Sequence, residues 1–179
     1  MDATTVNATD ENMEIIEGRE ERVSKIAKHH ILASMGVGLI PIPLVDLAAL
    51  TGIQLNMIRK LCKEYDVPFK EDRGKSIVTS LLGGLLSTEI GASLSSLIKC
   101  LPVIGQTVGA ATMPVIAGAA TYAIHVVFVK HFEEGGTILD LDPAKMKSFF
   151  TEQFTKGKKT ATAMHAEAET TDKKAETEA

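Results

Sequence analysis

The chain has 179 residues and a formal net charge of −4, and it is 45% apolar but only 4% aromatic. This length fits one domain with terminal extensions, or a small membrane protein, rather than a multi-domain enzyme. The slight acidic excess gives no electrostatic basis for binding nucleic acid. The two cysteines, Cys62 and Cys100, are too few for a disulfide framework or a cysteine-based metal site.

The N-terminal third of the chain is polar at first and then becomes periodic. Residues 1–10 show no apolar periodicity, and we expect them to be disordered. Over residues 11–35 apolar side chains recur at helical spacing, which predicts an amphipathic helix. Glutamates occupy its first half and lysines its second half, an order that complements the helix dipole. Gly36 and Gly38 are expected to end this helix.

A second helix is predicted from about Leu44 to about Tyr65. Pro41 and Pro43 precede it and force an extended or turning segment. Its apolar positions cover a broad face and are Leu47, Leu50, Ile53, Leu55, Ile58 and Leu61. Residues 66–75 then form a charged connection, in which Pro68 argues against a helix.

Two apolar segments follow and indicate a membrane environment. Residues 76–98 contain one charged side chain, Glu89, and residues 100–129 contain none. Both segments exceed the roughly 20 residues that cross the hydrocarbon core of a bilayer as a helix. We therefore expect a membrane-associated module with a helical hairpin at 76–129. The charge on Glu89 leaves an alternative, in which residues 76–98 form an amphipathic or re-entrant helix.

The flanks of these segments predict an orientation and a packing surface. Lysines and arginines lie before residue 76 and after residue 129, whereas the turn between the segments offers only Lys99. This asymmetry predicts that both termini lie in the cytoplasm. Gly105 and Gly109 form a small-residue spacing that lets membrane helices approach closely, and Glu89 could face the neighbouring helix there. The alternative is ordinary close packing of Gly- and Ala-rich helices in a soluble core.

The C-terminal part of the chain is predicted to hold one further helix. Asp142 and Pro143 are typical of a helix start, so a short C-terminal helix is expected within residues 136–155. Residues 156–179 lack a sustained apolar stripe and are expected to be a disordered tail. Because no strand-like alternation of useful length occurs, the sequence predicts an all-α fold.

No motif for catalysis, cofactor binding or metal binding is found. Gly74-Lys75-Ser76 matches the end of a phosphate-binding loop, but Phe69 stands where the pattern requires glycine. His29 and His30 are adjacent and point to different sides of a helix, so they cannot bind one metal ion together. We therefore expect no enzyme activity, no cofactor and no metal.

The run from Gly38 to Ile58, G-L-I-P-I-P-L-V-D-L-A-A-L-T-G-I-Q-L-N-M-I, is distinctive as a whole. With the Gly-rich apolar portion at 77–91, it resembles a bacterial domain of unknown function that is associated with GTPases and is also found at the end of YcjF-type inner-membrane proteins. The similarity covers about residues 25–135 and marks 36–135 as a GTPase-associated helical domain. It implies an α-helical module linked to the bacterial inner membrane and without known catalytic residues, whose GTPase would be a separate protein.

Two functional hypotheses follow. In the first, the protein is a non-enzymatic membrane module that binds lipid and docks a partner, such as a GTPase, through the surface around residues 41–60. The docking candidates are Pro41, Pro43, Asp46, Gln54 and Arg59. In the second, the chain is a soluble helical bundle that acts as an oligomeric scaffold. A homo-oligomer is compatible with either hypothesis. Ion conduction through Glu89 and His125 would rest on two isolated residues.

Overall fold

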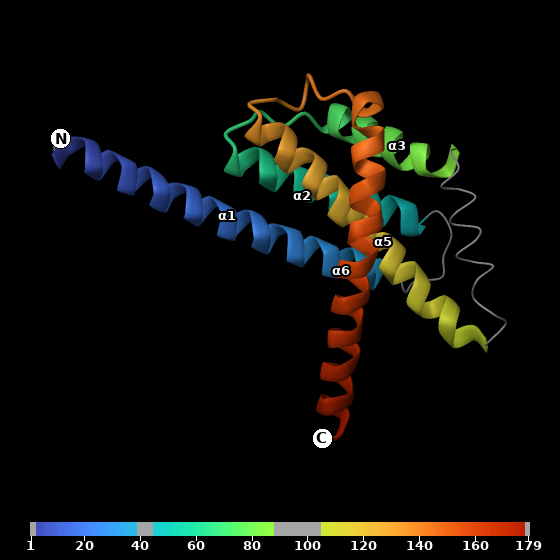
Figure 1. Cartoon of the computed structure of the whole chain (residues 1–179). Coiled ribbons are helices and arrows are strands. Elements are labelled where there is room, and N and C mark those ends of the chain that lie inside the picture. The colour runs from blue at the N-terminus through green and yellow to red at the C-terminus, as the bar shows by residue number, and fades with distance from the viewer. Residues whose placement is uncertain (1–2, 39–44, 88–104, 178–179) are drawn as a thin grey trace.

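The computed structural model describes residues 3–38, 45–87 and 105–177 of the chain. Within these ranges it contains helices and no strand (Figure 1), so the predicted all-α fold is confirmed. The helices are α1 (Ala3–Val37), α2 (Val45–Glu64), α3 (Glu71–Ser87), α5 (Gly105–Glu133) and α6 (Pro143–Thr177).

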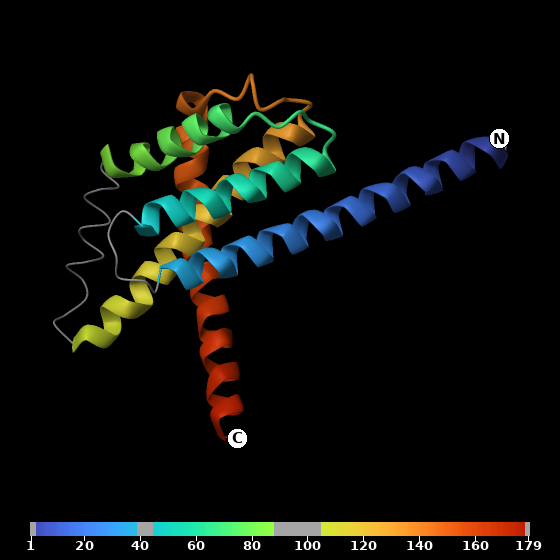
Figure 2. The ribbon, with the colours of Figure 1, turned by 180° about the vertical axis from the view of Figure 1, so that it is seen from behind.

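Helix α5 is the centre of the bundle. It packs against α6, α1 and α2, while α3 packs against α6 and α2. The main core contains apolar side chains from all these helices, and its largest fully buried members include Phe128, Phe150, Phe154, Met57, Ile58 and Leu61. The N-terminal end of α1 and the C-terminal end of α6 project away from this body, as the front and back views show (Figures 1 and 2).

Local signals explain where the helices begin and end. Asp66 adopts a left-handed φ of 54° after α2, and the N–H of Val67 donates to the Cys62 carbonyl over 2.8 Å. Gly135, at φ 80°, ends α5 in the same left-handed backbone conformation. Helix α6 starts as predicted, because the Asp142 carboxylate accepts the N–H of Ala144 over 2.9 Å.

The predicted disorder at the two ends of the chain is not found. Helix α1 begins at Ala3, and α6 continues to Thr177 instead of ending near residue 155. In α6 the helix passes residue 155 because Gly157 and Ala161 pack closely on α5 and α1, which requires small side chains rather than an apolar stripe. At the N-terminus, each added residue extends an existing helix without a new nucleation cost.

The described part of the first apolar segment is an amphipathic helix of the bundle. Helix α3 starts at Glu71, inside the connection that was expected to be non-helical, and Glu71 and Asp72 supply negative charge to its first turn. Ile77, Val78 and Leu81 are buried on its inner face. Since α3 packs mainly on α6 and α2, the described residues of 76–129 do not form a simple hairpin of two paired helices.

One helix in the described residues, Met113–Glu133, is long and apolar enough to cross a membrane. However, 61% of its most apolar window is buried inside the protein, as in the core helix of a soluble bundle. The second half of the charge-free tract is thus largely covered by neighbouring helices.

Candidate functional site

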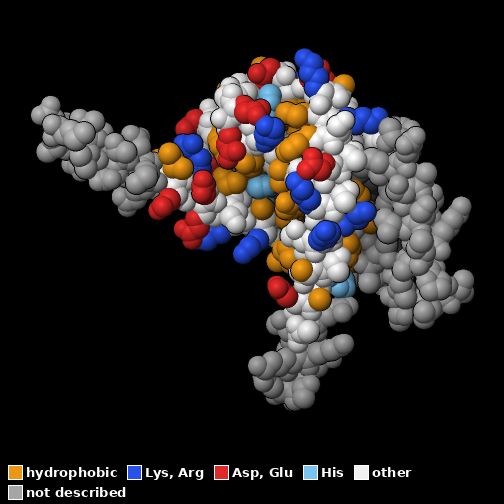
Figure 3. Space-filling model, in the orientation of Figure 1, with side chains coloured by type: hydrophobic (Ala, Val, Ile, Leu, Met, Phe, Trp, Pro, Cys, Tyr) orange, Lys and Arg blue, Asp and Glu red, His pale blue; other side chains and the backbone are white. Residues whose placement is uncertain are grey.

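An apolar groove of about 600 Å³ lies between α1 and α6, and we call it the α1–α6 groove. Ile31 of α1, Tyr122 of α5 and Met164 of α6 are among its apolar lining, and Lys28 and Glu167 add charged groups. Figure 3 shows hydrophobic side chains gathered in the angle between the two helices, with acidic side chains prominent along α1 and basic ones along α6. A groove of this kind suits an amphipathic helix.

The α1–α6 groove exists because small residues let three helices meet at its base. A Cβ added to Gly118 of α5 would lie 2.8 Å from Cγ of Met35 and 3.1 Å from the Ala161 methyl group. A Cβ on Gly157 of α6 would lie 2.9 Å from the Ala119 carbonyl oxygen. The helices therefore cross at backbone contact and diverge on either side, which leaves the space between α1 and α6.

A buried polar layer joins α1, α2 and α5 behind this groove. The Thr121 hydroxyl lies 2.7 Å from the Ser34 hydroxyl and accepts a hydrogen bond from the Gln54 amide over 3.3 Å. All three side chains are fully buried. The Gln54 carbonyl oxygen has no partner within the described structure. This layer fixes the register of three helices, because sliding one of them would leave buried polar groups unpaired.

Two histidines adjoin the polar layer and are held neutral by burial. His30 donates from Nδ1 to the Ile26 carbonyl over 2.7 Å, and His125 donates from Nε2 to the Val23 carbonyl over 3.3 Å. Burial lowers the pKa of His30, and it lowers the pKa of His125 to about 4. Both rings thus act as hydrogen-bond donors to α1.

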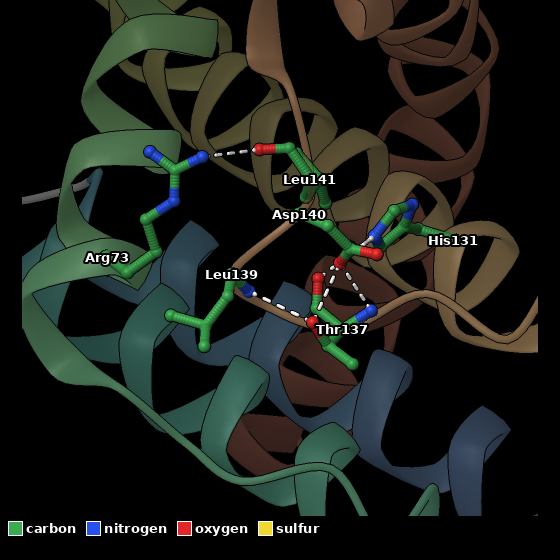
Figure 4. A network of polar contacts seen from close by, with 6 residues as sticks. All are labelled: Arg73, His131, Thr137, Leu139, Asp140 and Leu141. Carbon is green, nitrogen blue, oxygen red and sulfur yellow. Dashed lines mark hydrogen bonds and ion pairs between the residues drawn. The ribbon is translucent and has the colours of Figure 1, made fainter.

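The loop between α5 and α6 is held by a polar network (Figure 4). The Asp140 carboxylate accepts hydrogen bonds from the Thr137 N–H and hydroxyl, at 2.6 and 2.8 Å, and lies 3.2 Å from His131 Nε2. The Thr137 hydrogen bonds, followed by the one from His131, lower the pKa of Asp140 to about 2. Arg73 of α3 donates to the Leu141 carbonyl over 2.9 Å. The network ties α3 to the loop and offers no open coordination site.

Of the five predicted docking residues, the structure describes the side chains of Gln54 and Arg59 only, and these two do not share a surface. Gln54 is fully buried in the polar layer, so its side chain is not exposed to a partner in this structure. Arg59 is exposed on α2, 3.4 Å from the Glu71 carboxylate, with its guanidinium 5.0 Å from the centre of the Phe69 ring. Asp46 lies at the start of α2, where only its backbone is described. Pro41 and Pro43 lie outside the described residues.

The three membrane-packing candidates are only partly described. Glu89 lies outside the described residues. Gly105 and Gly109 lie in the first turns of α5. Among the described residues, close helix contacts of small residues occur at Gly118 and Gly157. Among the described residues no group of three or more His, Cys, Asp or Glu side chains is placed to hold a metal ion.

Sequence reasoning missed the α1–α6 groove because residues 156–179 were expected to be disordered. A usable signal was present: Ala161, Met164 and Ala168 recur at spacings of three and four, which marks one face of a helix.

Comparisons with known proteins assign this helical bundle to a family. The profile of the family described as "Domain of unknown function (DUF697)" matches residues 3–159, so the chain belongs to that family. A relative, "Magnetosome membrane protein 22" of Magnetospirillum gryphiswaldense (strain DSM 6361 / JCM 21280 / NBRC 15271 / MSR-1), is 41% identical over 153 residues, which cover 85% of this chain and 78% of the relative. No solved structure matches the chain significantly.

Proposed function

We propose that this protein is a non-enzymatic helical module that associates with the bacterial inner membrane and docks a partner there. The proposal rests on the low charge of residues 88–112. This stretch contains only two formally charged side chains, Glu89 and Lys99. Met113, which follows them in α5, is 49% exposed although it is apolar. The relative named as a magnetosome membrane protein supports the same conclusion.

The packing of α5 limits which residues of the chain can contact lipid. Met113–Glu133 is largely covered by protein, and Ile77, Val78 and Leu81 of α3 belong to the core. The apolar sequence left for lipid is residues 88–112, whose 25 residues are too few to cross a bilayer twice as helices. We therefore propose shallow or re-entrant insertion from the cytoplasmic face, with both termini in the cytoplasm, in place of a two-span hairpin.

Carbonate-washed membrane fractionation tests the association. We expect the full-length protein to remain in the membrane pellet, and Leu97→Arg to shift it toward the soluble fraction because a charge enters the apolar sequence. Leu139→Arg is the matched control, since Leu139 is 62% exposed on the α5–α6 loop. Recovery of the wild-type protein in the soluble fraction would contradict membrane association.

Thiol labelling tests the depth of insertion. Cys62 is buried, and burial raises its pKa to about 11, so a membrane-impermeant maleimide should report on Cys100 alone. We expect no labelling of Cys100 from the periplasmic side in spheroplasts, with a Cys100→Ser variant as the background control. Labelling from that side would support the two-span hairpin instead.

For the partner, we propose a separate Ras- or Era-like GTPase that docks around α2. Support comes from the sequence resemblance and from the exposure of Arg59, while Pro41, Pro43 and Asp46 remain candidates. A pull-down of such a GTPase, loaded with GDP or a GTP analogue, is expected to weaken with Asp46→Ala or Arg59→Ala. Lys145→Ala, at an exposed lysine of α6, serves as a control. Full retention in both test variants would argue against this surface.

The second candidate function is a soluble oligomeric scaffold. It is favoured by the partial burial of α5, because an apolar helix that is mostly covered by protein has less need of lipid. A monodisperse, detergent-free species from cells, without any membrane-bound pool, would select this function over the first.

A further inference from the structure

We propose that one side of α6 binds the headgroups of anionic phospholipids and thereby orients the protein on the membrane. We call this side the α6 basic face and define it by Lys147, Thr151, Lys158 and Thr162. The proposal rests on the membrane association proposed above and adds the class of lipid. It is supported by the charge along α6, by the side of the bundle on which this face lies, and by the distribution of carboxylates over the rest of the protein.

The first part of α6 is basic in a chain that is acidic as a whole. Residues 143–166 contain five lysines and a single acidic side chain, Glu152, whereas the whole chain has a net charge of −4. Glu152 pairs with Lys156 over 2.7 Å. It lies five residues after Lys147, so it points to another side of the helix. The α6 basic face therefore carries positive charge and no carboxylate.

The lysines of the α6 basic face are available to an anion. The four members of this face are separated by four, seven and four residues, spacings that place them on one side of a helix, and all are at least partly exposed. The ammonium group of Lys158 lies 5.7 Å from the centre of the Phe154 ring, which leaves its hydrogen-bond donors free. Among the described residues, none of the ion pairs involves Lys147 or Lys158.

The α6 basic face lies on the side of the bundle where the charge-poor residues 88–112 begin. A Cβ added to Gly84 of α3 would lie 3.2 Å from Cε of Lys147, so the Lys147 stem packs on the last turn of α3. Helix α3 ends at Ser87 and α5 begins at Gly105, and both of these ends lie on the same side of α6 (Figures 1 and 2). Insertion of residues 88–112 into a bilayer would therefore bring the α6 basic face close to the lipid headgroups.

Most carboxylates are placed away from this face. Apart from Glu152 and Glu167 of α6, the acidic side chains that the structure describes lie on α1 or at the end of the bundle where α2 ends, α3 begins and α5 meets α6. These are Glu17, Glu20, Glu21, Glu64, Asp66, Glu71, Asp72, Glu133, Glu134, Asp140 and Asp142. An anionic bilayer repels this acidic part of the surface and attracts the basic side chains along α6, which Figure 3 shows. The charge distribution thus favours one orientation of the protein on such a bilayer.

The expected gain in affinity follows from the two lysines. A lysine near an anionic membrane surface strengthens binding by roughly fivefold. Lys147 and Lys158 are eleven residues apart, about 17 Å along a helix, which exceeds the screening length of about 10 Å at 0.1 M salt. Their contributions are therefore nearly independent, and together they predict roughly twentyfold tighter binding to anionic than to neutral lipid.

Vesicle flotation of the full-length protein tests the α6 basic face. The vesicles consist of phosphatidylcholine alone or of phosphatidylcholine mixed with phosphatidylglycerol. We expect the wild-type protein to bind the mixed vesicles roughly twentyfold more tightly, and Lys147→Gln/Lys158→Gln to lose this preference while it still binds neutral vesicles. Lys147→Arg/Lys158→Arg keeps both charges and should bind as the wild type does. Circular dichroism checks that each variant remains helical.

Lys63→Gln/Lys70→Gln is the matched control, because it removes two exposed lysines at the end of the bundle where the carboxylates gather. It should keep the preference for anionic vesicles, although its net charge equals that of Lys147→Gln/Lys158→Gln. A Lys147→Gln/Lys158→Gln variant that keeps the preference would overturn the proposal. Equal binding of the wild type to both vesicles would also overturn it, and would favour an acidic protein surface as the partner of this face. Either result leaves membrane association intact, whereas a protein that floats with neither vesicle contradicts membrane association and this proposal together.

Salt and soluble phosphate show what the lysines recognise. The preference for anionic vesicles should largely disappear at 1 M salt, where the screening length falls to about 3 Å. Excess glycerol 3-phosphate at constant ionic strength should leave the protein on the mixed vesicles, because a single soluble phosphate lacks the charge density of a bilayer surface. Displacement by glycerol 3-phosphate would indicate a discrete phosphate site and overturn the assignment to lipid. A preference that is insensitive to salt would do the same.

Discussion

At the scale of single residues, the core depends on hydrogen bonds as well as on apolar contact. Thr121 is the centre of the buried polar layer, because its hydroxyl contacts both Ser34 of α1 and Gln54 of α2. Since every member is fully buried, removing the shared hydroxyl leaves its partners without water to replace it.

We expect Thr121→Val to lower the free energy of unfolding by about 1–3 kcal/mol, because it leaves the Ser34 hydroxyl and the Gln54 amide buried and unpaired. Gln54→Met should cost less, since the Gln54 carbonyl oxygen already lacks a partner. Urea denaturation measures both, with Thr79→Val on the exposed side of α3 as a control. Equal losses for Thr121→Val and Thr79→Val would contradict a structural role for the layer.

The pKa of His125 predicts a specific loss of stability in mild acid. The ring has a pKa of about 4 in the folded protein, because burial disfavours its charged form, and an ordinary value of 6.5 when unfolded. The unfolded chain therefore binds the extra proton between these values, so stability is full above pH 6.5 and falls as the pH drops toward 4, by on the order of 3 kcal/mol. His30 contributes in the same direction.

Urea titrations between pH 7 and pH 4 measure this loss. His125→Gln should flatten the dependence, since its amide can still donate to the Val23 carbonyl but does not titrate. Asp140 titrates in a lower window, because its pKa is about 2 when folded; Asp140→Asn should therefore lower stability at pH 4 and above, and this difference should fade as the pH falls from about 4 toward 2. A pH profile that is identical in wild type and His125→Gln would refute the assignment.

At the scale of helices, close crossings rather than amphipathic stripes hold α6 on α5. Gly157 contacts the backbone of Ala119 and the ring of Tyr122, and Ala161 is fully buried against Met35. Helices that meet through small residues bring many backbone atoms into van der Waals contact, but they give a weak sequence signal.

We expect Gly157→Ala to lower the free energy of unfolding by about 1–3 kcal/mol, because its Cβ would lie 2.9 Å from the Ala119 carbonyl oxygen. Gly52→Ala is the matched control: it meets no atom within 4 Å, so it should stabilise α2 by up to about 1 kcal/mol. Thermal unfolding followed by circular dichroism measures both. A stabilising Gly157→Ala would show that the α5–α6 contact is looser than the structure indicates.

At the scale of the whole molecule, α5 is shielded from solvent by α1, α2 and α6 together. Removing any one of these helices exposes part of an apolar helix that carries no formal charge over 105–129. The bundle is therefore a cooperative unit, in which the second half of α6 belongs to the fold.

Truncation tests this dependence on α6. A chain that ends after residue 168 should keep its thermal midpoint within a few degrees, because the contacts of Gly157, Ala161 and Met164 are retained. A chain that ends after residue 155 should become less stable and aggregate without detergent, since it uncovers Tyr122 and the adjoining face of α5. Equal stability of the two chains would indicate that residues 156–168 are dispensable.

The sequence alone determined the features that depend on neighbouring residues. These are the all-α class, the glycines that end α1, the extent of α2 and the Asp142 cap of α6, because periodicity, caps and helix-breaking residues act within a few positions. It also identified the charge-poor tract 100–129, whose composition suits either lipid or a protein core.

Tertiary structure decided between these environments for 113–133, since only the packing of α1, α2 and α6 shows what covers it. It likewise placed Gln54 in the core and formed the α1–α6 groove, because both depend on helices that are distant in the sequence and meet only in the fold.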